Sequence, residues 1–107
     1  MADRRQVFLG ELFMADLRES CSYYDQKSKD YLRNLGEELF NEVLKEITFI
    51  SENPFQFPVL EKDARIRICV LQKFPFTILF RLLTEDTVEI VTLAHHSRDP
   101  KTWFRSS

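Results

Sequence analysis

The hydrophobic period of this 107-residue chain changes near its middle. Up to about residue 53, apolar side chains recur every three or four positions, which is the spacing of one face of a helix. After Asp63 they recur at every second position, which is the spacing of one face of a strand. A helical layer and a sheet each need a partner to bury their apolar side. The sequence therefore predicts an α+β fold with two layers.

Two helices are predicted in the first half, at residues 11 to about 26 and 30 to about 53, where the following Pro54 disfavours the helical conformation. A polar break separates them, so they form a hairpin, and Ser28 can cap the second helix. Each helix carries one apolar stripe: Phe13, Leu17, Cys21 and Tyr24, then Leu32, Leu35, Leu39, Val43, Ile47 and Ile50. Gly36 interrupts the second stripe at a cost of ~1 kcal/mol relative to Ala, which suggests a close approach of the two helices.

Three strands are predicted in the second half, at residues 66–70, 76–83 and 88–95, and they most simply form an antiparallel meander. Both faces of the middle segment are apolar, so we expect it to be the central strand. Residues 6–9 are either a further strand or the approach to the first helix. The expected architecture is an N-terminal helical hairpin packed on a small, mainly antiparallel sheet of three to four strands. The shared core is predicted to contain Leu17, Leu35, Leu39, Val43, Ile68, Ile78, Phe80 and Ile90.

Composition limits the class of protein. With 107 residues, 44% of them hydrophobic, the chain has enough apolar material for one core, and we expect a single domain over residues 1–107. No apolar run approaches the ~20 residues of a membrane span, and the first residues do not resemble a signal peptide. A cytoplasmic protein without a membrane partner is therefore expected. Cys21 and Cys69 are too far apart in sequence for a zinc motif or a disulfide framework, so no metal site is expected.

Charge is distributed unevenly along the chain. Residues 1–64 carry a net charge of −5 and residues 65–107 a net charge of +3, which together give the overall −2. A surface that attracts anions should therefore come from the C-terminal half, where Arg65, Arg67 and Arg81 are expected on one face of the sheet. A merely solvated strand face is the alternative. An acidic total charge is unfavourable for general binding of nucleic acid.

Four motifs follow one another along nearly the whole chain. They are Ala15-Asp16-Leu17 with Tyr23-Tyr24; Ile50-x-x-Asn53-Pro54-x-x-Phe57-Pro58; Arg67 with Phe74-Pro75-Phe76-x-Ile78-x-Phe80-Arg81; and Val91-x-x-Ala94-His95-x-x-Arg98-Asp99-Pro100-x-x-Trp103. In this order and at these spacings, the chain resembles the RelE/ParE superfamily, the toxin halves of bacterial toxin–antitoxin pairs. The resemblance implies a cognate antitoxin as partner and no cofactor.

The superfamily contains two activities, and the sequence bears on both. RelE-like members are ribosome-dependent mRNA endoribonucleases, whereas ParE-like members inhibit DNA gyrase by binding. RNA cleavage needs a base, an acid and cations at the phosphate, for which the candidates here are His95, His96, Arg98 and Arg81. RelE-like nucleases carry an arginine at the strand position that Thr77 occupies in this chain. That difference, the His-x-x-Arg-Asp-Pro tail and the acidic charge favour the ParE-like, plasmid-stabilisation branch.

In the ParE-like interpretation no residue is catalytic, and partner binding is assigned to Arg65, Arg67, Arg81, Arg98 and Trp103. Structural roles are the alternative. The ring of His95 could hydrogen-bond the tail backbone, Asp99 could pair with an arginine, and Trp103 could close the edge of the core. Nucleic acid is an expected partner only for RelE-like activity. A third interpretation is an inactive member of the family that only binds a partner protein.

Overall fold

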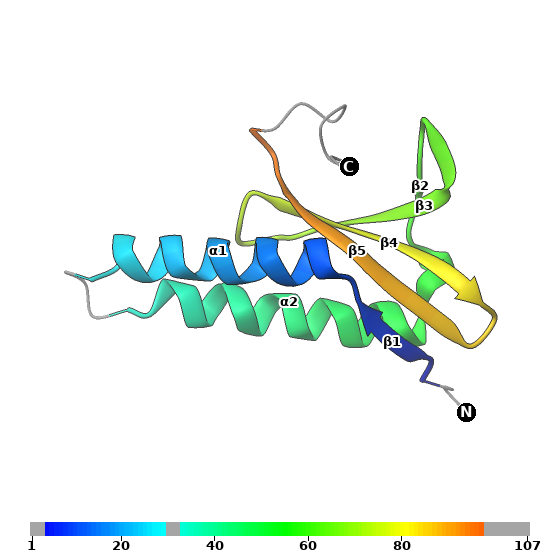
Figure 1. Cartoon of the computed structure of the whole chain (residues 1–107), viewed down its shortest axis with the longest axis horizontal. Helices are drawn as coiled ribbons and strands as arrows, with labels where there is room; N and C mark the ends of the chain where they lie inside the picture. Colours follow the sequence, from blue (N-terminus) through cyan, green and yellow to red (C-terminus); the bar gives the residue numbers. More distant parts are fainter. Residues whose placement is uncertain (1–3, 30–32, 98–107) are drawn as a thin grey trace.

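The computed structural model describes residues 4–29 and 33–97 (Figure 1). Its elements, in chain order, are β1 (Gln6–Leu9), α1 (Glu11–Lys27), α2 (Leu35–Glu52), the 3-10 turn η1 (Pro54–Gln56), β2 (Val59–Leu60), β3 (Asp63–Val70), β4 (Phe76–Thr84) and β5 (Thr87–His95). The helices α1 and α2 run side by side in one layer, and the sheet forms the other. The predicted α+β fold, a helical hairpin packed on a small sheet, is confirmed.

The sheet has five strands in the order β1-β5-β4-β3-β2. As predicted, β3, β4 and β5 form an antiparallel meander with β4 at its centre. The predicted three to four strands are too few, because β2 adds an antiparallel edge and β1 adds a parallel one beside β5. Residues 6–9 are thus a strand rather than the approach to a helix. Strands of two and four residues are too short to show a period of two in the sequence.

The second helix begins later than predicted, at Leu35 rather than at residue 30. The side chain of Asn34 accepts a hydrogen bond from the backbone N–H of Glu37 (3.1 Å), which makes it the N-cap. The hydroxyl of Ser28 also accepts a hydrogen bond, from the N–H of Leu35 (3.3 Å), and so satisfies one donor at the start of this helix. The apolar period of the sequence continues upstream of the cap, which explains the misplaced start.

The helices and the sheet share one main core. It contains Leu17, Leu39, Val43, Ile78, Phe80 and Ile90, as predicted, together with Phe13, Ile47, Ile50, Cys69, Leu71, Phe74, Phe76, Val88 and Leu93. Two predicted members are outside it. Leu35 is only half-buried, and Ile68 lies on the second face of the sheet, packed against a small cluster of Ile66, Leu79 and Ala94. In β3 it is Cys69, opposite Ile78, that faces the helices. The alternation of residues along a strand shows which residues share a face. It does not show which of the two faces the helices cover.

The strand β5 changes phase at a β-bulge, because its pairing with β4 skips Val91. Beyond the bulge, Leu93 joins Ile90 in the main core, whereas Ala94 lies in the cluster on the second face. A period of two along the predicted strand 88–95 would put Ile90 and Leu93 on opposite faces, and at this point it fails. A bulge depends on the partner strand and leaves no local signal in a run of apolar residues.

Gly36 lets the two helices approach closely, as its position suggested. A Cβ atom at this residue would lie 2.6 Å from the carbonyl oxygen of Cys21 and would collide with the carboxylate of Asp25, both on α1. A larger side chain would therefore push the helices apart. The low helix propensity of glycine is offset here by the packing that it permits.

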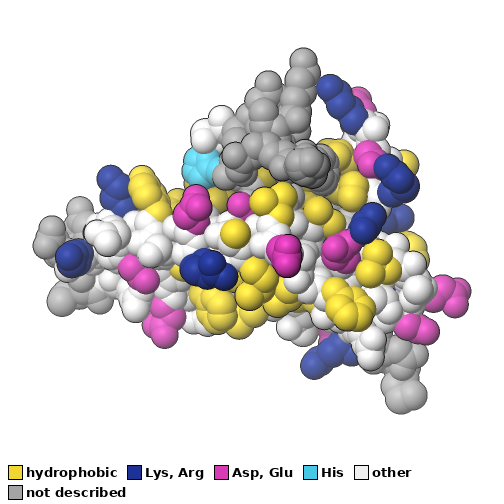
Figure 2. Space-filling model, viewed as in Figure 1, with side chains coloured by type: hydrophobic (Ala, Val, Ile, Leu, Met, Phe, Trp, Pro, Cys, Tyr) yellow, Lys and Arg dark blue, Asp and Glu magenta, His cyan; other side chains and the backbone are white. Residues whose placement is uncertain are grey.

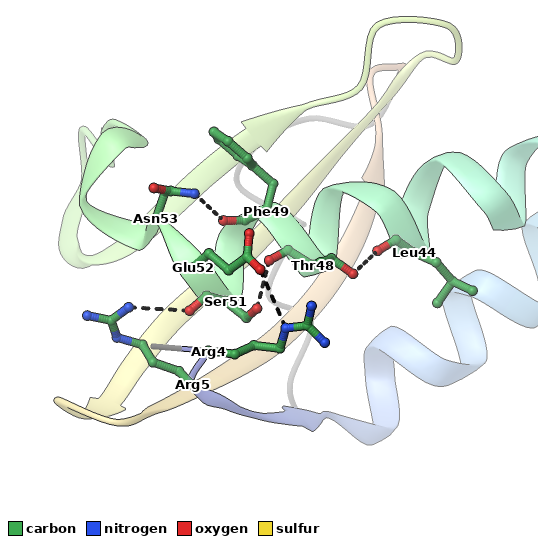
Figure 3. A network of polar contacts seen from close by, with 8 residues as sticks. All are labelled: Arg4, Arg5, Leu44, Thr48, Phe49, Ser51, Glu52 and Asn53. Atoms are coloured by element: carbon green, nitrogen blue, oxygen red, sulfur yellow. Dashed lines mark hydrogen bonds and ion pairs between the residues drawn. The ribbon is translucent and has the colours of Figure 1, made fainter. Parts of the chain in front are cut away.

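The C-terminal end of α2 is tied to the residues that precede β1 (Figure 3). The backbone N–H of Arg5 donates to the carbonyl oxygen of Ser51 (3.2 Å), and the Arg5 guanidinium donates to the same oxygen (3.3 Å). Arg4 forms an ion pair with Glu52 (3.5 Å). Cations at this end complement the partial negative charge of a helix C-terminus. The network thus holds the N-terminal strand against the helical layer.

Candidate functional site

The two histidines at the end of β5 lie in different surroundings. The ring of His95 packs against Phe76 with a centroid distance of 5.0 Å, and its Nδ1 accepts a hydrogen bond from the backbone N–H of Ser97 (3.0 Å). The Nε2 of His96 lies 3.0 Å from the hydroxyl of Thr77. His95 therefore makes the hydrogen bond to the following backbone that the sequence allowed, and each ring already has a partner within the chain.

The ring of His95 lines a cavity of about 380 Å³ between α1 and the ends of β4 and β5. The other lining residues are Glu19, Ser20, Tyr23, Tyr24, Phe76 and Ser97. Of the tyrosine pair, Tyr24 packs on the main core while Tyr23 is exposed at the surface. Burial raises the pKa of the Tyr24 phenol. No sequence pattern connects this pair with His95, because they lie about seventy positions apart and share only the lining of the cavity.

The three arginines expected on one face of the sheet do not share a face. Arg67 pairs with Phe80 in the sheet and so lies on the helical side, whereas Arg81 follows Phe80 and lies on the second face. The Arg81 guanidinium is paired with Glu89 (2.6 Å). That part of the prediction is wrong, because it counted alternation separately in each strand without knowing how the strands align.

Arg65 is also engaged, since its guanidinium donates to both carboxylate oxygens of Asp63 (3.0 Å each). These hydrogen bonds hold the pKa of the Asp63 carboxyl below its usual value. The remaining candidates of the C-terminal tail, Arg98 and Trp103, lie outside the described residues, as does Asp99.

The described nuclease candidates do not converge on one point, because the adjacent His95 and His96 lie on opposite faces of the sheet and Arg81 is distant from both. Thr77, which contacts His96, and Arg81 are four residues apart on β4, or roughly 13 Å at ~3.3 Å per residue. His95 packs on Phe76, a residue of the main core, and so belongs to the helical side of the sheet. An acid, a base and a phosphate-binding cation must all reach one phosphate. Within residues 4–29 and 33–97, His95, His96 and Arg81 do not meet this condition.

Asp16, of the Ala-Asp-Leu motif, joins α1 to β5. The last pair between β1 and β5 is Leu9 with Ile90, and within residues 4–29 and 33–97 no strand pairs with β5 on that side beyond this point. The carboxylate of Asp16 accepts hydrogen bonds from the hydroxyl of Thr92 (2.6 Å) and the N–H of Leu93 (3.3 Å). The motif therefore has a structural role that fixes the helix against the free edge of the strand.

Apolar side chains gather on the outer surface of the helical layer (Figure 2). Met14, Phe40 and Leu44 are 40–42% exposed. Met14 and Phe40 border a hollow of about 380 Å³ that also touches Arg18 and Asp25. Exposed apolar side chains that lie together in this way are typical of surfaces that bind another protein. No binding residue was predicted on this surface from the sequence.

Both cysteines are free and carry neutral thiols at neutral pH. Burial of Cys69, with Glu46 beside it, raises the pKa of its thiol to about 12. Burial also raises the pKa of the Cys21 thiol. In the part of the chain that the structure describes, no cluster of three or more histidine, cysteine or acidic side chains could hold a metal ion. No helix in the same part is both long and apolar enough to span a membrane.

Comparison with known proteins identifies the fold. No family model and no curated protein matches the chain. A chain of the chromosomal ParDE TA system from P. aeruginosa matches with a TM-score of 0.69 and 14% identity, over 87% of this chain and 97% of that one. A chain of the RelBE2 toxin–antitoxin complex from Mycobacterium tuberculosis matches with a TM-score of 0.61 and 15% identity, over 92% of this chain and 98% of that one. The chain thus shares its fold with these two chains of toxin–antitoxin systems, in agreement with the fold that its motifs implied.

Proposed function

We propose that this chain is the toxin component of a type II toxin–antitoxin system, a single cytoplasmic domain of the ParE-like, plasmid-stabilisation type. It inhibits DNA gyrase by binding, without catalysis or a cofactor, and a cognate antitoxin neutralises it. The fold shared with chains of a ParDE system and a RelBE2 complex supports the assignment to this class of protein. The order of the four sequence motifs supports it independently.

One observation carries the choice of the ParE-like branch: the described candidates for RNA cleavage are dispersed and already paired. His96 contacts Thr77, at the position where RelE-like nucleases carry an arginine, and Arg81 is paired with Glu89. A cation that is neutralised by a carboxylate stabilises the charge of a phosphate poorly, and loss of one such contact typically slows a reaction by 10²-fold or more. A binding function makes no such demand.

The exposed apolar side chains of the helical layer favour a protein partner. Met14, Phe40 and Leu44 offer apolar area that a partner helix or extended segment could bury. An antitoxin that covers this surface would gain hydrophobic stabilisation without any special chemistry from the toxin. The net charge of −2 argues against nucleic acid as the main partner.

Two assays on the full-length chain test the proposal. Induced expression in a bacterium without the antitoxin should stop growth, and the purified chain should inhibit DNA supercoiling by gyrase. If the culture continues to grow and gyrase is not inhibited, the proposed toxin function is wrong. The remaining interpretation is then a non-toxic family member that only binds its partner.

A ribosome-dependent RNA cleavage assay distinguishes the competing enzyme function. We expect no mRNA cleavage with or without ribosomes. Cuts that disappear in the His96→Ala variant but persist in the His95→Ala variant would establish RelE-like endoribonuclease activity instead. A contaminating nuclease would cut equally in both variants.

A further inference from the structure

Two arginines lie over one exposed aromatic ring near the C-terminal end of α2. The guanidinium carbon of Arg67 is 5.3 Å from the centroid of the Phe55 ring, and that of Arg5 is 5.8 Å from the same centroid. Phe55 is 65% exposed, more than any other large hydrophobic side chain described. A single exposed apolar residue needs no explanation. Two cations over one exposed ring are a specific arrangement within the range of cation–π attraction.

Both guanidiniums are held in place by backbone oxygens. Arg67 donates to the carbonyl of Phe57 (2.6 Å). Arg5 donates through Nε to the carbonyl of Glu85 (2.8 Å). It also donates through Nη1 to the carbonyl of Ser51 (3.3 Å), as Figure 3 shows. A guanidinium has five N–H donors, so each arginine keeps donors for a partner. Because their positions are already fixed, less side-chain entropy is lost when a partner binds.

Neither arginine forms an ion pair with any residue of the ranges 4–29 and 33–97. In those ranges Arg4, Arg33, Arg65 and Arg81 are each paired with a carboxylate. Arg5 and Arg67 are instead neighbours of carbonyl oxygens and of Phe55. Their charges are therefore available to an anion that comes from outside this part of the chain.

Exposed apolar side chains lie near Arg67, while the turn that contains Glu85 lies beside Arg5. Phe49 and Val59, which are 42% and 43% exposed, lie close by: Val59 is the sheet partner of Arg67, and Phe49 packs against the ring of Phe57. A ligand for this surface should combine carboxylates with apolar side chains. Single-stranded nucleic acid also uses arginine and aromatic contacts, but it needs a basic groove along its backbone, and this chain is acidic overall.

We propose that Arg5, Phe55 and Arg67 form a docking site for an acidic segment with interspersed apolar side chains. The inference rests on the proposed function, since the segment that it describes would belong to the antitoxin. Carboxylates of the segment receive the free guanidinium donors, and an apolar side chain packs on Phe55. The site would anchor one end of the antitoxin, away from the apolar surface of Met14 and Phe40.

The test uses fluorescence anisotropy with the full chain and three labelled probes. The first is a twelve-residue peptide made of three Gly-Glu-Leu-Glu repeats, the second replaces every Glu by Gln, and the third is a twelve-nucleotide oligouridine. We expect only the acidic peptide to bind, and more weakly as salt is raised, because exposed charges are screened over ~8 Å at physiological ionic strength. Oligouridine binding tighter than that of the acidic peptide would assign the site to RNA and overturn the proposal.

Matched variants locate the binding. Arg67→Gln should weaken peptide binding about tenfold, as expected for loss of one charge-assisted contact. Arg33→Gln, beside the opposite end of α2, should leave it unchanged because that side chain is paired with Glu38. Phe55→Ala should weaken binding several-fold, whereas Phe8→Ala, which removes another exposed ring on β1, should not. Equal affinities across all four folded variants would overturn the site.

Toxicity of the same variants separates this inference from the proposed function. Arg67→Gln and Phe55→Ala chains that remain toxic and lose the peptide support both. Toxic chains with unchanged peptide affinity would retain the function and reject the site. A wild-type chain that binds the peptide in a site-dependent way without being toxic would keep the site and reject the function.

Discussion

The two faces of the sheet differ in what holds their side chains. On the helical side, large apolar residues such as Phe80, Ile78 and Ile90 are completely buried against α1 and α2. On the second face the apolar cluster is small, and polar pairs lie beside it, Thr77 with His96 and Arg81 with Glu89. The helical side therefore determines whether the chain folds. Polar residues on the second face can be replaced with little effect on stability. Members of one fold can therefore acquire different activities on this face.

The largest expected effect on stability, and the first test of the difference between the two faces, is the loss of an aromatic ring from the main core. Phe80→Ala should lower the free energy of unfolding by about 3–5 kcal/mol, because it removes a fully buried ring from a packed core. Ile68→Ala on the second face should cost about 1–2 kcal/mol, since Ile68 is only half-buried. Denaturation in urea measures both. Equal losses would mean that the two faces contribute alike to stability.

A smaller effect is expected where α1 meets the free edge of β5. Asp16→Ala should destabilise the chain by about 1–3 kcal/mol, because it leaves the N–H of Leu93 and the hydroxyl of Thr92 without their acceptor. Asp16→Asn keeps one acceptor oxygen and should cost less. If both variants are as stable as the wild type, water can replace the carboxylate and Asp16 does not fix the helix.

The close approach at Gly36 gives the next effect. Gly36→Ala should destabilise the chain by about 1–2 kcal/mol although alanine favours helices, because the added methyl group meets the backbone of Cys21. Thermal unfolding followed by circular dichroism would measure the change. A stabilised variant would show that the helices can separate at this point without loss of the core.

The smallest effect at neutral pH concerns the thiol of Cys69, and it grows with pH. The pKa of this group is about 12 in the folded chain, above the ~8.5 of an exposed cysteine, so the unfolded state loses its proton first. Stability should therefore be unaffected at pH 7 and fall as pH rises above about 8.5. The wild type should lose about 2 kcal/mol more than Cys69→Ala between pH 7 and pH 10. Parallel pH curves for the two proteins would show that the thiol ionises freely in the folded state.

Much of the fold could be predicted from local patterns. The bounds of α1, the central position of β4 and the stripe of Leu39 and Val43 follow from hydrophobic period and length, because each is a property of one continuous segment. The start of α2 was missed because a single cap residue, Asn34, overrides the apolar period. The phase of Leu93 was missed because a bulge is decided by the partner strand.

The candidate site was less predictable, because it depends on which segments meet. His95 and His96 were found as adjacent polar residues at the end of a strand, but their different surroundings follow from Phe76 and Thr77 on the neighbouring strand. Arg5 and Phe55 carry no motif. They are brought together with Arg67 only when the N-terminal strand, η1 and β3 are in place, so no sequence pattern pointed to them.

The parallel pairing of β1 with β5 has a consequence for how this protein is made. Gln6 pairs with Thr87, and Leu9 with Ile90, so the sheet joins segments from near the two ends of the chain. Such distant contacts form slowly, since a long loop must be closed before they stabilise anything. During translation β1 leaves the ribosome early and remains unpaired with β5 until that strand is synthesised. The helical hairpin can already assemble in the meantime. A nascent chain therefore cannot complete its sheet until β5 has been synthesised, although β1 is among the first segments to be made.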